Sequence, residues 1–223
     1  MPGHDDELIA VMLGDRRASP ALRRWLATTE GRRELGVYRQ TLRALERLYG
    51  PSPRPVIHYC VIATPIGRVL VAATEAGLVR VSFRQREAAF AAGLRRRLSA
   101  DVVRSPARTA RIVHQLRAYF AGERRAFDLE IDLRGLTPFQ RSVLRAAAEV
   151  PAGQVVSYGE IARRIGRPGG SRAVGQALGR NPVPIVIPCH RVIAAGGRLG
   201  GYGGGLAIKR KLLRIEGALP VAS

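Results

Sequence analysis

The 223-residue chain is poor in cysteine and aromatic residues, and it has no long apolar run. It has only two cysteines, Cys60 and Cys189, which is too few for a disulfide framework, so we interpret both as free thiols in a reducing compartment. No apolar stretch approaches the ~20 residues that span a bilayer, and the acidic N-terminus, MPGHDDELIA, lacks the layout of a signal peptide. These absences predict a cytoplasmic protein without a membrane-spanning segment. The 46% of hydrophobic residues predicts a globular chain.

Acidic residues are also scarce. Lys and Arg number 37 against 17 Asp and Glu, which gives a formal net charge of +20 and an isoelectric point near 11.6. Lysine supplies only two of the basic residues. GC-rich coding would explain arginine in place of lysine, but it would not explain the basic excess. The charge therefore predicts a polyanionic partner, and nucleic acid is the first choice.

The first part of the chain divides into three segments. Residues 1–50 have leucines at helical spacing and read as a helical extension of unknown role. PSPRP at 51–55 reads as a linker, since three prolines in five residues cannot continue a helix. Residues 56–133 read as an α/β unit, with three strands (VIHYCVIA, RVLVAAT and GLVRVSF), helices near 86–98 and 109–121, and a short strand, FDLEI. Cys60 lies in the first strand and is interpreted as a buried structural thiol.

Residues 134–223 are expected to form a mainly helical domain. TPFQ places Thr137 at the N-cap and Gln140 at N3, a capping box that opens a helix. SYGE has the pattern of a second capping box, with Ser157 as the N-cap and the Glu160 side chain bonding back to the cap residue. A third helix, RAVGQALGR, is expected to be capped by Ser171. Two short helices joined by a tight turn form a helix-turn-helix pattern, which is typical of DNA-binding proteins but is common elsewhere.

The third helix favours DNA binding more specifically. Ala173, Val174, Ala177 and Leu178 are expected to face inward. The outward positions would then include two glycines, so the backbone could approach a narrow groove while Arg172 projects. The alternative is an ordinary helix whose glycines pack against another element of the protein.

NPVPIVIPCHRVI, at 181–193, places Cys189 directly before His190 after an apolar run that reads as a buried strand. Most such neighbouring pairs are structural. Metal binding fits poorly, because no second cysteine or histidine cluster supplies the usual ligand spacing. Adjacent residues of a strand point to opposite faces, so the histidine could activate the thiol only if the chain turns there or a water bridges the two groups. The thiol would need activation, since its ordinary pKa is ~8.5.

Four segments together resemble the O6-alkylguanine-DNA alkyltransferase family. PCHR is that family's signature, and SYGEIA, SRAVGQALGRNP and GGYGGGLAIKRKLLRIEG stand in the family's order and spacing. The likeness covers residues 136–217 closely and 56–133 loosely. It implies an α/β N-terminal unit and a mainly helical C-terminal domain with a helix-turn-helix and a small wing, here preceded by the helical extension.

The resemblance implies a suicidal DNA-repair protein that moves the alkyl group from the O6 atom of guanine to its own cysteine. Cys189 matches the acceptor, and His190 matches its water-mediated base. Glu216 matches the acid that orients the histidine, and Asn181 matches the asparagine that braces the turn. Tyr158 matches the tyrosine that helps to rotate the nucleotide and donates to the departing base. This chemistry needs no metal and no cofactor, and the implied partner is double-stranded DNA, contacted from its minor-groove side.

The same family scheme implies the residues that bind the substrate. Arg172 matches the residue that fills the stack after the base is flipped, and the main chain of Val192, with Tyr202, lines the base pocket. Gly203 stands where many relatives have serine, which removes one donor and leaves the range of alkyl groups and activity on O4-alkylthymine open. The other positions expected to contact substrate or DNA are Ser171, Gly175, Gln176 and Arg191.

The extension departs from the family. Residues 13–45 faintly resemble the small zinc-binding helical domain of anti-sigma factors, but Arg24, Thr28 and Gly31 occupy the ligand positions, which implies a zinc-free module or a plain helical extension. A protein partner could bind there. Two further functions stay open: a non-catalytic sensor of alkylated DNA, which the intact Cys189 disfavours, and a transcriptional regulator with residues 1–50 as its regulatory arm.

Overall fold

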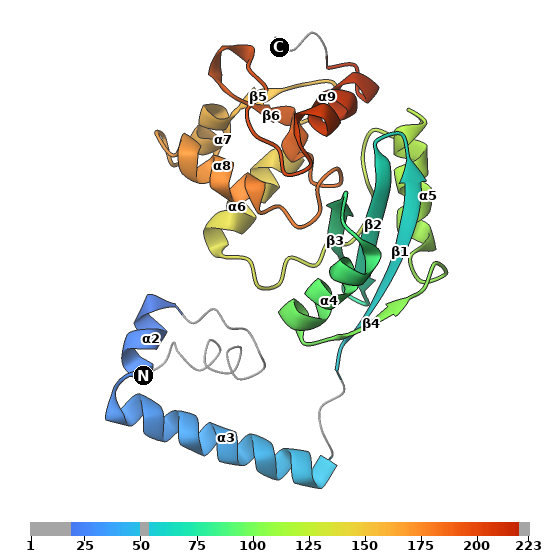
Figure 1. The fold of residues 1–223 in the computed structure, drawn as a ribbon. Helices are drawn as coiled ribbons and strands as arrows, with labels where there is room; N and C mark the ends of the chain where they lie inside the picture. Colours follow the sequence, from blue (N-terminus) through green and yellow to red (C-terminus); the bar gives the residue numbers. More distant parts are fainter. Residues whose placement is uncertain (1–18, 50–53, 219–223) are drawn as a thin grey trace. The chain divides into compact units, whose positions relative to one another are not determined.

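The computed structural model describes residues 19–49 and 54–218 (Figure 1). Contacts within the chain divide it into two compact units, residues 1–55 with 96–101, and residues 56–95 with 102–223. The four-segment division expected from the sequence stays a prediction. Among the described residues, no helix is both long and apolar enough to cross a membrane.

The described part of the first unit consists mainly of two helices, as the leucine spacing predicts. α2 (Pro20–Leu26) begins after Ser19, whose side chain accepts from the Leu22 amide at 3.0 Å. α3 (Thr29–Tyr49) follows after a tight corner. At that corner Gly31 lies against the backbone of Trp25, where a Cβ atom would stand 2.2 Å from a carbonyl oxygen. The corner therefore requires a glycine. The side chains of Leu42 and Leu45 lie outside the described residues.

The second unit begins with a four-stranded sheet. β1 (Val56–Thr64), β2 (Gly67–Thr74) and β3 (Gly77–Phe83) form the expected antiparallel meander. β4 (Asp101–Arg104) lies beside β1, so that the order is β3-β2-β1-β4. Five consecutive residues of β2 are buried, because both faces of the sheet are covered. This explains why the sequence of β2 is continuously apolar.

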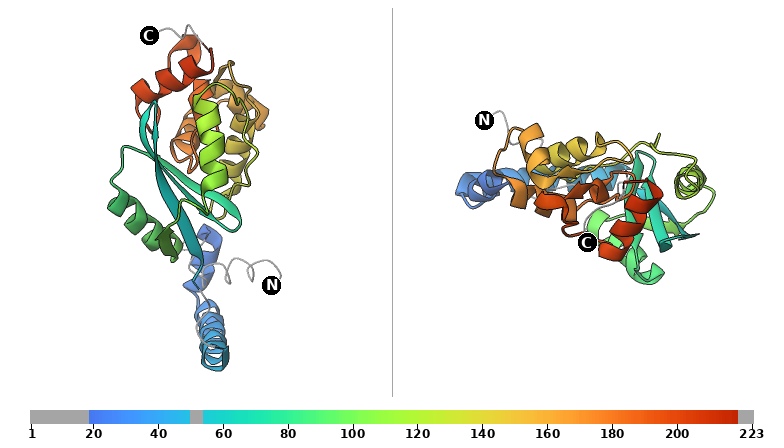
Figure 2. Two further views of the ribbon diagram at one scale, coloured as in Figure 1. Left: turned by 90° about the vertical axis from the view of Figure 1, so that its right-hand side faces the viewer. Right: turned by 90° about the horizontal axis from the view of Figure 1, so that it is seen from above.

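One helix covers each face of the sheet (Figure 2). α5 (Ala110–Phe120) packs on the face that carries Cys60, and its buried side chains join the main core. α4 (Glu87–Leu98) packs on the other face, where the rings of Tyr59 and Phe90 lie 6.0 Å apart. Cys60 is buried and free of a disulfide, in agreement with a structural thiol.

The sequence prediction was wrong at two strands of this unit. Residues 127–131 form no strand, because only one bridge, between Leu78 and Ile131, joins them to the sheet. β4 was not predicted, since its four residues, DVVR, carry too short a pattern. Its place at the sheet edge comes from tertiary contacts, including the bond from the Ser105 amide to the Tyr59 carbonyl at 2.9 Å.

The following helices confirm the helix-turn-helix arrangement and one capping box in full. α6 (Pro138–Ala148) has the reciprocal capping box of Thr137 and Gln140. β5 (Val156–Ser157) leads into α7 (Tyr158–Arg164), where Ser157 caps as expected. The side chain of Glu160, however, forms an ion pair with Arg164 at 2.6 Å, instead of the predicted bond back to the cap.

α8 (Ser171–Gly179) is the third helix. Gly170 is its N-cap and Ser171 its first helical residue, so the predicted serine cap was wrong. Three of the four positions predicted to face inward are buried, but Ala173 is exposed. α8 packs on both α6 and α7.

The chain then forms the segment that holds the reactive residues. The apolar run at 185–187 is buried, but it forms a turn and no strand, and Ile185 has a φ of 78°, a conformation that β-branched residues rarely adopt. A 3-10 turn, η1 (Cys189–Arg191), leads into β6 (Val192–Ile193), which pairs with β5 in parallel. The turn η2 (Ala195–Gly197), a glycine-rich loop and α9 (Leu206–Ile215) complete the unit.

Candidate active site

Cys189 begins a tight turn that Asn181 braces. The Asn181 side-chain amide donates to the Ile187 carbonyl at 2.9 Å, and its Oδ1 accepts from the Val183 amide at 3.0 Å. The same amide nitrogen lies 3.2 Å from the Cys189 Sγ. The chain turns at the cysteine and the histidine, which form the start of the 3-10 turn η1, so the condition stated for direct activation of the thiol is met.

The Cys189 thiol is buried beside an open cleft. Its residue is 8% exposed, and burial raises its pKa to about 11, although the Asn181 amide and the charge of Lys209 act in the opposite direction. The cleft has an empty volume of about 550 Å³ and is lined by Arg80, Val81, Ser82, Phe83, Leu178, Gly179, Asn181, Pro184, Cys189, Tyr202, Gly203 and Gly204. A ligand in this cleft would meet the sulfur directly.

His190 is held in one orientation by Glu216. Its Nε2 lies 2.8 Å from the Glu216 Oε1, and its Nδ1 has no hydrogen-bond partner among the described residues. Burial lowers the pKa of His190, against the opposite effect of the Glu216 hydrogen bond, so the ring is neutral near pH 7. With the Nε2 hydrogen donated to the carboxylate, Nδ1 is left as a proton acceptor.

Glu216 is fixed as a carboxylate by several donors. Arg191 donates to both of its oxygens, each at 2.8 Å. Although burial alone would raise the pKa of Glu216, the hydrogen bonds from His190 and Arg191 hold it at about 2. Arg191 is itself buried, and it also donates to the Val150 carbonyl. The structure thus places the Arg191 side chain in the Glu216 network, and the expected contact of Arg191 with substrate or DNA stays a prediction.

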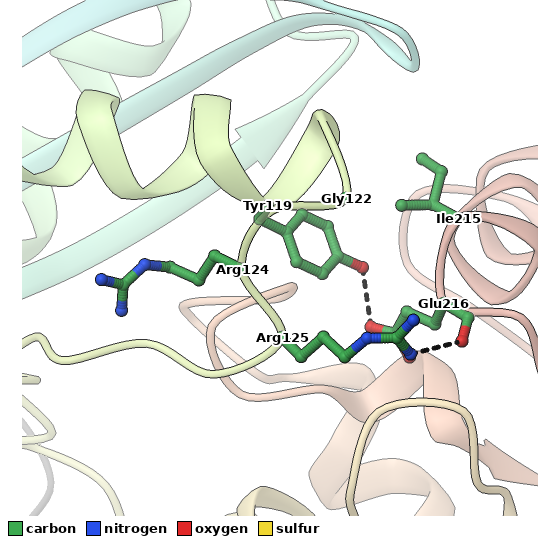
Figure 3. A pocket seen from close by; sticks show the side chains of 6 residues that line it. All are labelled: Tyr119, Gly122, Arg124, Arg125, Ile215 and Glu216. Atoms are coloured by element: carbon green, nitrogen blue, oxygen red, sulfur yellow. Dashed lines mark hydrogen bonds between the residues drawn. The ribbon is translucent and has the colours of Figure 1, made fainter.

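Tyr119 of α5 completes the network around Glu216, and the sequence did not point to it. Its hydroxyl donates to the Glu216 Oε1 at 2.7 Å, and its side chain is almost fully buried. Figure 3 shows the hydroxyl pointing at the carboxylate in a small pocket, where Arg125 donates to the Glu216 main-chain carbonyl at 3.3 Å. Tyr119 shares the buried face of α5 with Leu116. A buried tyrosine needs a hydroxyl partner, but only the fold identifies that partner.

Lys209 of α9 is a second residue that sequence reasoning missed. The residue is 0% exposed, and its Nζ donates to the carbonyls of Val192 at 2.7 Å, Leu199 at 2.5 Å and Gly201 at 3.4 Å. Burial lowers its pKa to about 8, so at neutral pH the amine remains charged. Lys209 therefore ties the glycine-rich loop to β6. A lysine among the apolar positions of an amphipathic helix was the available signal.

Tyr158 and the helix-turn-helix lie next to this loop. The Tyr158 hydroxyl is 3.3 Å from the Gly201 carbonyl, and a Cβ atom at Gly200 would come within 2.9 Å of its ring. Gly175 of α8 also faces the ring, at ordinary contact distance. Arg172 and Gln176 are exposed on α8, while Ser171 is half-buried. The roles of these residues toward DNA stay predictions.

Tyr202 and Gly203 line the cleft with Cys189. The Tyr202 ring lies 6.1 Å from the Phe83 ring of β3 and 6.5 Å from the His190 ring. No atom lies within 4 Å of a Cβ atom placed on Gly203, so the missing serine leaves open space. Val192 is buried in β6, and its carbonyl accepts from Lys209.

The arrangement suits transfer of a group to sulfur. A thiol lies at the edge of a cleft, a neutral histidine has a free acceptor nitrogen, and a carboxylate fixed by donors stabilises the imidazolium that forms. Among the described residues, no group of three or more His, Cys, Asp or Glu could hold a metal ion.

Two family models match the chain. The ribonuclease-like domain of 6-O-methylguanine DNA methyltransferase matches residues 57–133, and the DNA binding domain of 6-O-methylguanine DNA methyltransferase matches residues 138–218. Together they span both the sheet and the Cys189 segment.

Curated relatives and solved structures agree with this match. The methylated-DNA–protein-cysteine methyltransferase of Mycobacterium tuberculosis strain H37Rv is 47% identical, over 72% of this chain and 93% of the relative. That of Methanosarcina acetivorans is 43% identical, over 73% of this chain and 99% of the relative. The crystal structure of Mycobacterium tuberculosis OGT in complex with DNA has a TM-score of 0.62 at 43% identity, over 72% and 92% of the two chains. The chain therefore belongs to the 6-O-methylguanine DNA methyltransferase family, the methylated-DNA–protein-cysteine methyltransferases of DNA repair, and carries both domains of that family.

Proposed function

We propose that this protein repairs O6-alkylguanine in double-stranded DNA by moving the alkyl group irreversibly to Cys189. The observation that carries the proposal is the joint geometry at one cleft. The Asn181-braced turn places the thiol at its edge, and the Glu216-bound histidine follows in the same turn with Nδ1 free. Family membership supplies the reaction class, and this geometry supports the assignment of the residues.

DNA binding and base flipping come first. The O6 atom is inaccessible inside a duplex, so the nucleotide must rotate out at a cost of a few kcal/mol. Arg172 is exposed on α8 and is assigned to fill the vacated stack from the minor-groove side. Tyr158 packs on the glycine-rich loop and is assigned to turn the nucleotide toward the cleft, where Tyr202 and the main chain at Val192 receive the base.

The chemical step is a displacement at the alkyl carbon. His190 Nδ1 takes the thiol proton through a bridging water, and Glu216 stabilises the imidazolium. The thiolate forms the new S–C bond while the C–O6 bond breaks, and its electron pair goes to the guanine. Tyr158 donates a proton to that leaving base and regains one from the imidazolium through solvent, so protons balance. No step needs a metal or a cofactor.

Each molecule is expected to work once. The product is a thioether, which lacks the electrophilic carbonyl that allows water to release an acyl-enzyme. The protein is therefore consumed with one alkyl group per chain.

The testing experiment is intact-protein mass spectrometry after incubation with excess duplex that contains O6-methylguanine. The expected result is a single methyl group on Cys189, with repaired guanine reaching a plateau at one equivalent. Cys189→Ser should lose transfer, whereas Cys60→Ser should keep it, because Cys60 is buried in the sheet core. Unmethylated protein that still binds the lesion would favour the sensor function, and a plateau well above one equivalent would contradict single use.

A further inference from the structure

α3 carries five arginines on one side of the helix. All five side chains are exposed: Arg32, Arg33, Arg39, Arg43 and Arg47. At 100° per residue they fall within an arc of about 120°. Arg47 lies over Arg43, since its Nε donates to the Arg43 carbonyl at 3.3 Å. We refer to these five residues as the arginine face.

Among the described side chains of α3, no carboxylate lies within the arc of the arginine face. Glu30 and Glu34 lie about 120° and 160° around the helix from the centre of the arginine face. The half-buried Leu35 and Tyr38 lie on a third side. Among the residues whose side chains are described, none forms an ion pair with the arginine face. Its positive charge is therefore available to an outside anion.

The spacing of the arginines matches an extended polyanion. Arg32, Arg39, Arg43 and Arg47 follow one line along the helix, with a length of about 22 Å at 1.5 Å per residue. That length corresponds to about six base pairs of duplex at ~3.4 Å each. A small anion would engage one or two of these guanidinium groups, whereas a duplex backbone can engage the whole line.

We propose that the arginine face binds the phosphate backbone of duplex DNA, as a contact additional to the helix-turn-helix. The inference rests on the proposed function, which makes DNA the polyanion this protein meets. It assigns a role to a segment that neither family model reaches. Phosphate contacts of this kind carry no sequence information, so they add affinity for DNA of any sequence.

An anionic membrane surface is the competing polyanion, because basic amphipathic helices bind such surfaces. Two observations favour DNA. The basic excess is spread along the whole chain instead of being confined to α3, and the remaining exposed part of α3 mixes the apolar Val37 and Leu48 with Glu30, Glu34 and Thr41. A helix that enters lipid needs a broad apolar face opposite its basic one.

The test compares two triple variants of the full chain on an unmodified duplex of about 30 base pairs, with the dissociation constant measured against salt concentration. The first is Arg39→Gln, Arg43→Gln and Arg47→Gln. The control is Arg86→Gln, Arg108→Gln and Arg117→Gln, which removes the same charge from exposed positions of the second unit. Each lost phosphate contact should reduce the slope of log K against log salt by about 0.9. The first variant should therefore lose about 2–3 from the slope, and the control should lose less than one.

Two further measurements separate the outcomes. Transfer from free O6-benzylguanine to Cys189 should be unchanged in both variants, because the free base needs no phosphate contact. Failure of the wild-type protein to react would contradict the proposed function alone. Equal slopes for the first variant and the wild type, or equal losses in both variants, would overturn the arginine-face proposal. Binding to phosphatidylserine vesicles that the first variant loses while its DNA slope stays unchanged would also overturn it, in favour of a membrane.

Discussion

Removal of the Tyr119 hydroxyl should change both the stability of the protein and the pH dependence of its reaction. The hydroxyl donates to the Glu216 Oε1 at 2.7 Å in a buried site, and Tyr119→Phe keeps the ring. A hydrogen bond to a charged group contributes ~1.5–3 kcal/mol. For a chain of this size, 1 kcal/mol shifts the melting temperature by ~2–4 °C. The expected loss is roughly 3–12 °C.

The kinetic effect follows from the charge on Glu216. With one donor removed, the carboxylate interacts more strongly with a protonated His190, and this raises the pKa of the histidine above its depressed value. The histidine must be neutral to accept the thiol proton. The acid limb of the rate profile should therefore move to higher pH, by up to about one unit, or 1.36 kcal/mol.

The assay is the rate of methyl transfer from a methylated duplex to Cys189, followed by mass spectrometry between about pH 5 and 9. The matched control is Tyr59→Phe, whose hydroxyl donates to Glu87 at 3.1 Å in the same unit, remote from the reaction. It should lower the melting temperature modestly and leave the pH profile in place. If Tyr119→Phe also leaves the acid limb where the wild type has it, Tyr119 does not position Glu216.

Three other perturbations test the site. Lys209→Met should slow transfer even from free O6-benzylguanine, because the glycine-rich loop loses its bonds to the lysine. Lys211→Met, at a more exposed position, should leave the rate unchanged. Equal transfer rates for the two variants would contradict the role of Lys209 in holding the loop. Arg172→Ala should impair transfer from duplex DNA far more than from the free base, and equal losses would assign Arg172 to the fold or pocket. Since the pKa of Glu216 falls to about 2 on folding, its stabilisation is complete above pH ~4.5 and is lost as pH falls toward 2. Glu216→Gln should lack that part of the pH-dependent unfolding curve.

Local signals in the sequence predicted the elements whose stability is local. The Thr137 capping box and the three strands of the meander need only their own residues and nearest neighbours, and both are present. The 127–131 segment alternates apolar and polar residues like a strand, yet one bridge at Ile131 is all that joins it to the sheet. β4 is the opposite case, a strand that is present but was not predicted, because a four-residue edge strand is defined by its neighbour.

The residues of the site also differ in whether local sequence signals or only tertiary contacts identify them. Cys189, His190 and Asn181 are close in sequence, so a motif could bring them to notice together. Tyr119 stands 97 residues before Glu216, and Arg191 is buried although arginines are mostly exposed. Tyr119 reaches the carboxylate because α5 and α9 contribute to one core, and Arg191 reaches it because η1 packs against α9. The helical periodicity of α5 predicts that its tyrosine is buried, but it does not predict which acceptor the hydroxyl will bond.

The burial of Cys189 also affects how long a molecule that has not yet reacted retains its free thiol. Peroxides and stray electrophiles consume thiolates much faster than thiols. With a pKa of about 11, the thiolate fraction at pH 7 is on the order of one in ten thousand, against ~3% for an ordinary cysteine. Chemical attrition in the absence of damaged DNA should therefore be slower than for an exposed cysteine, although the higher nucleophilicity of a high-pKa thiolate offsets part of the effect. A protein that can react only once thereby retains an unmodified Cys189 until a flipped base occupies the cleft.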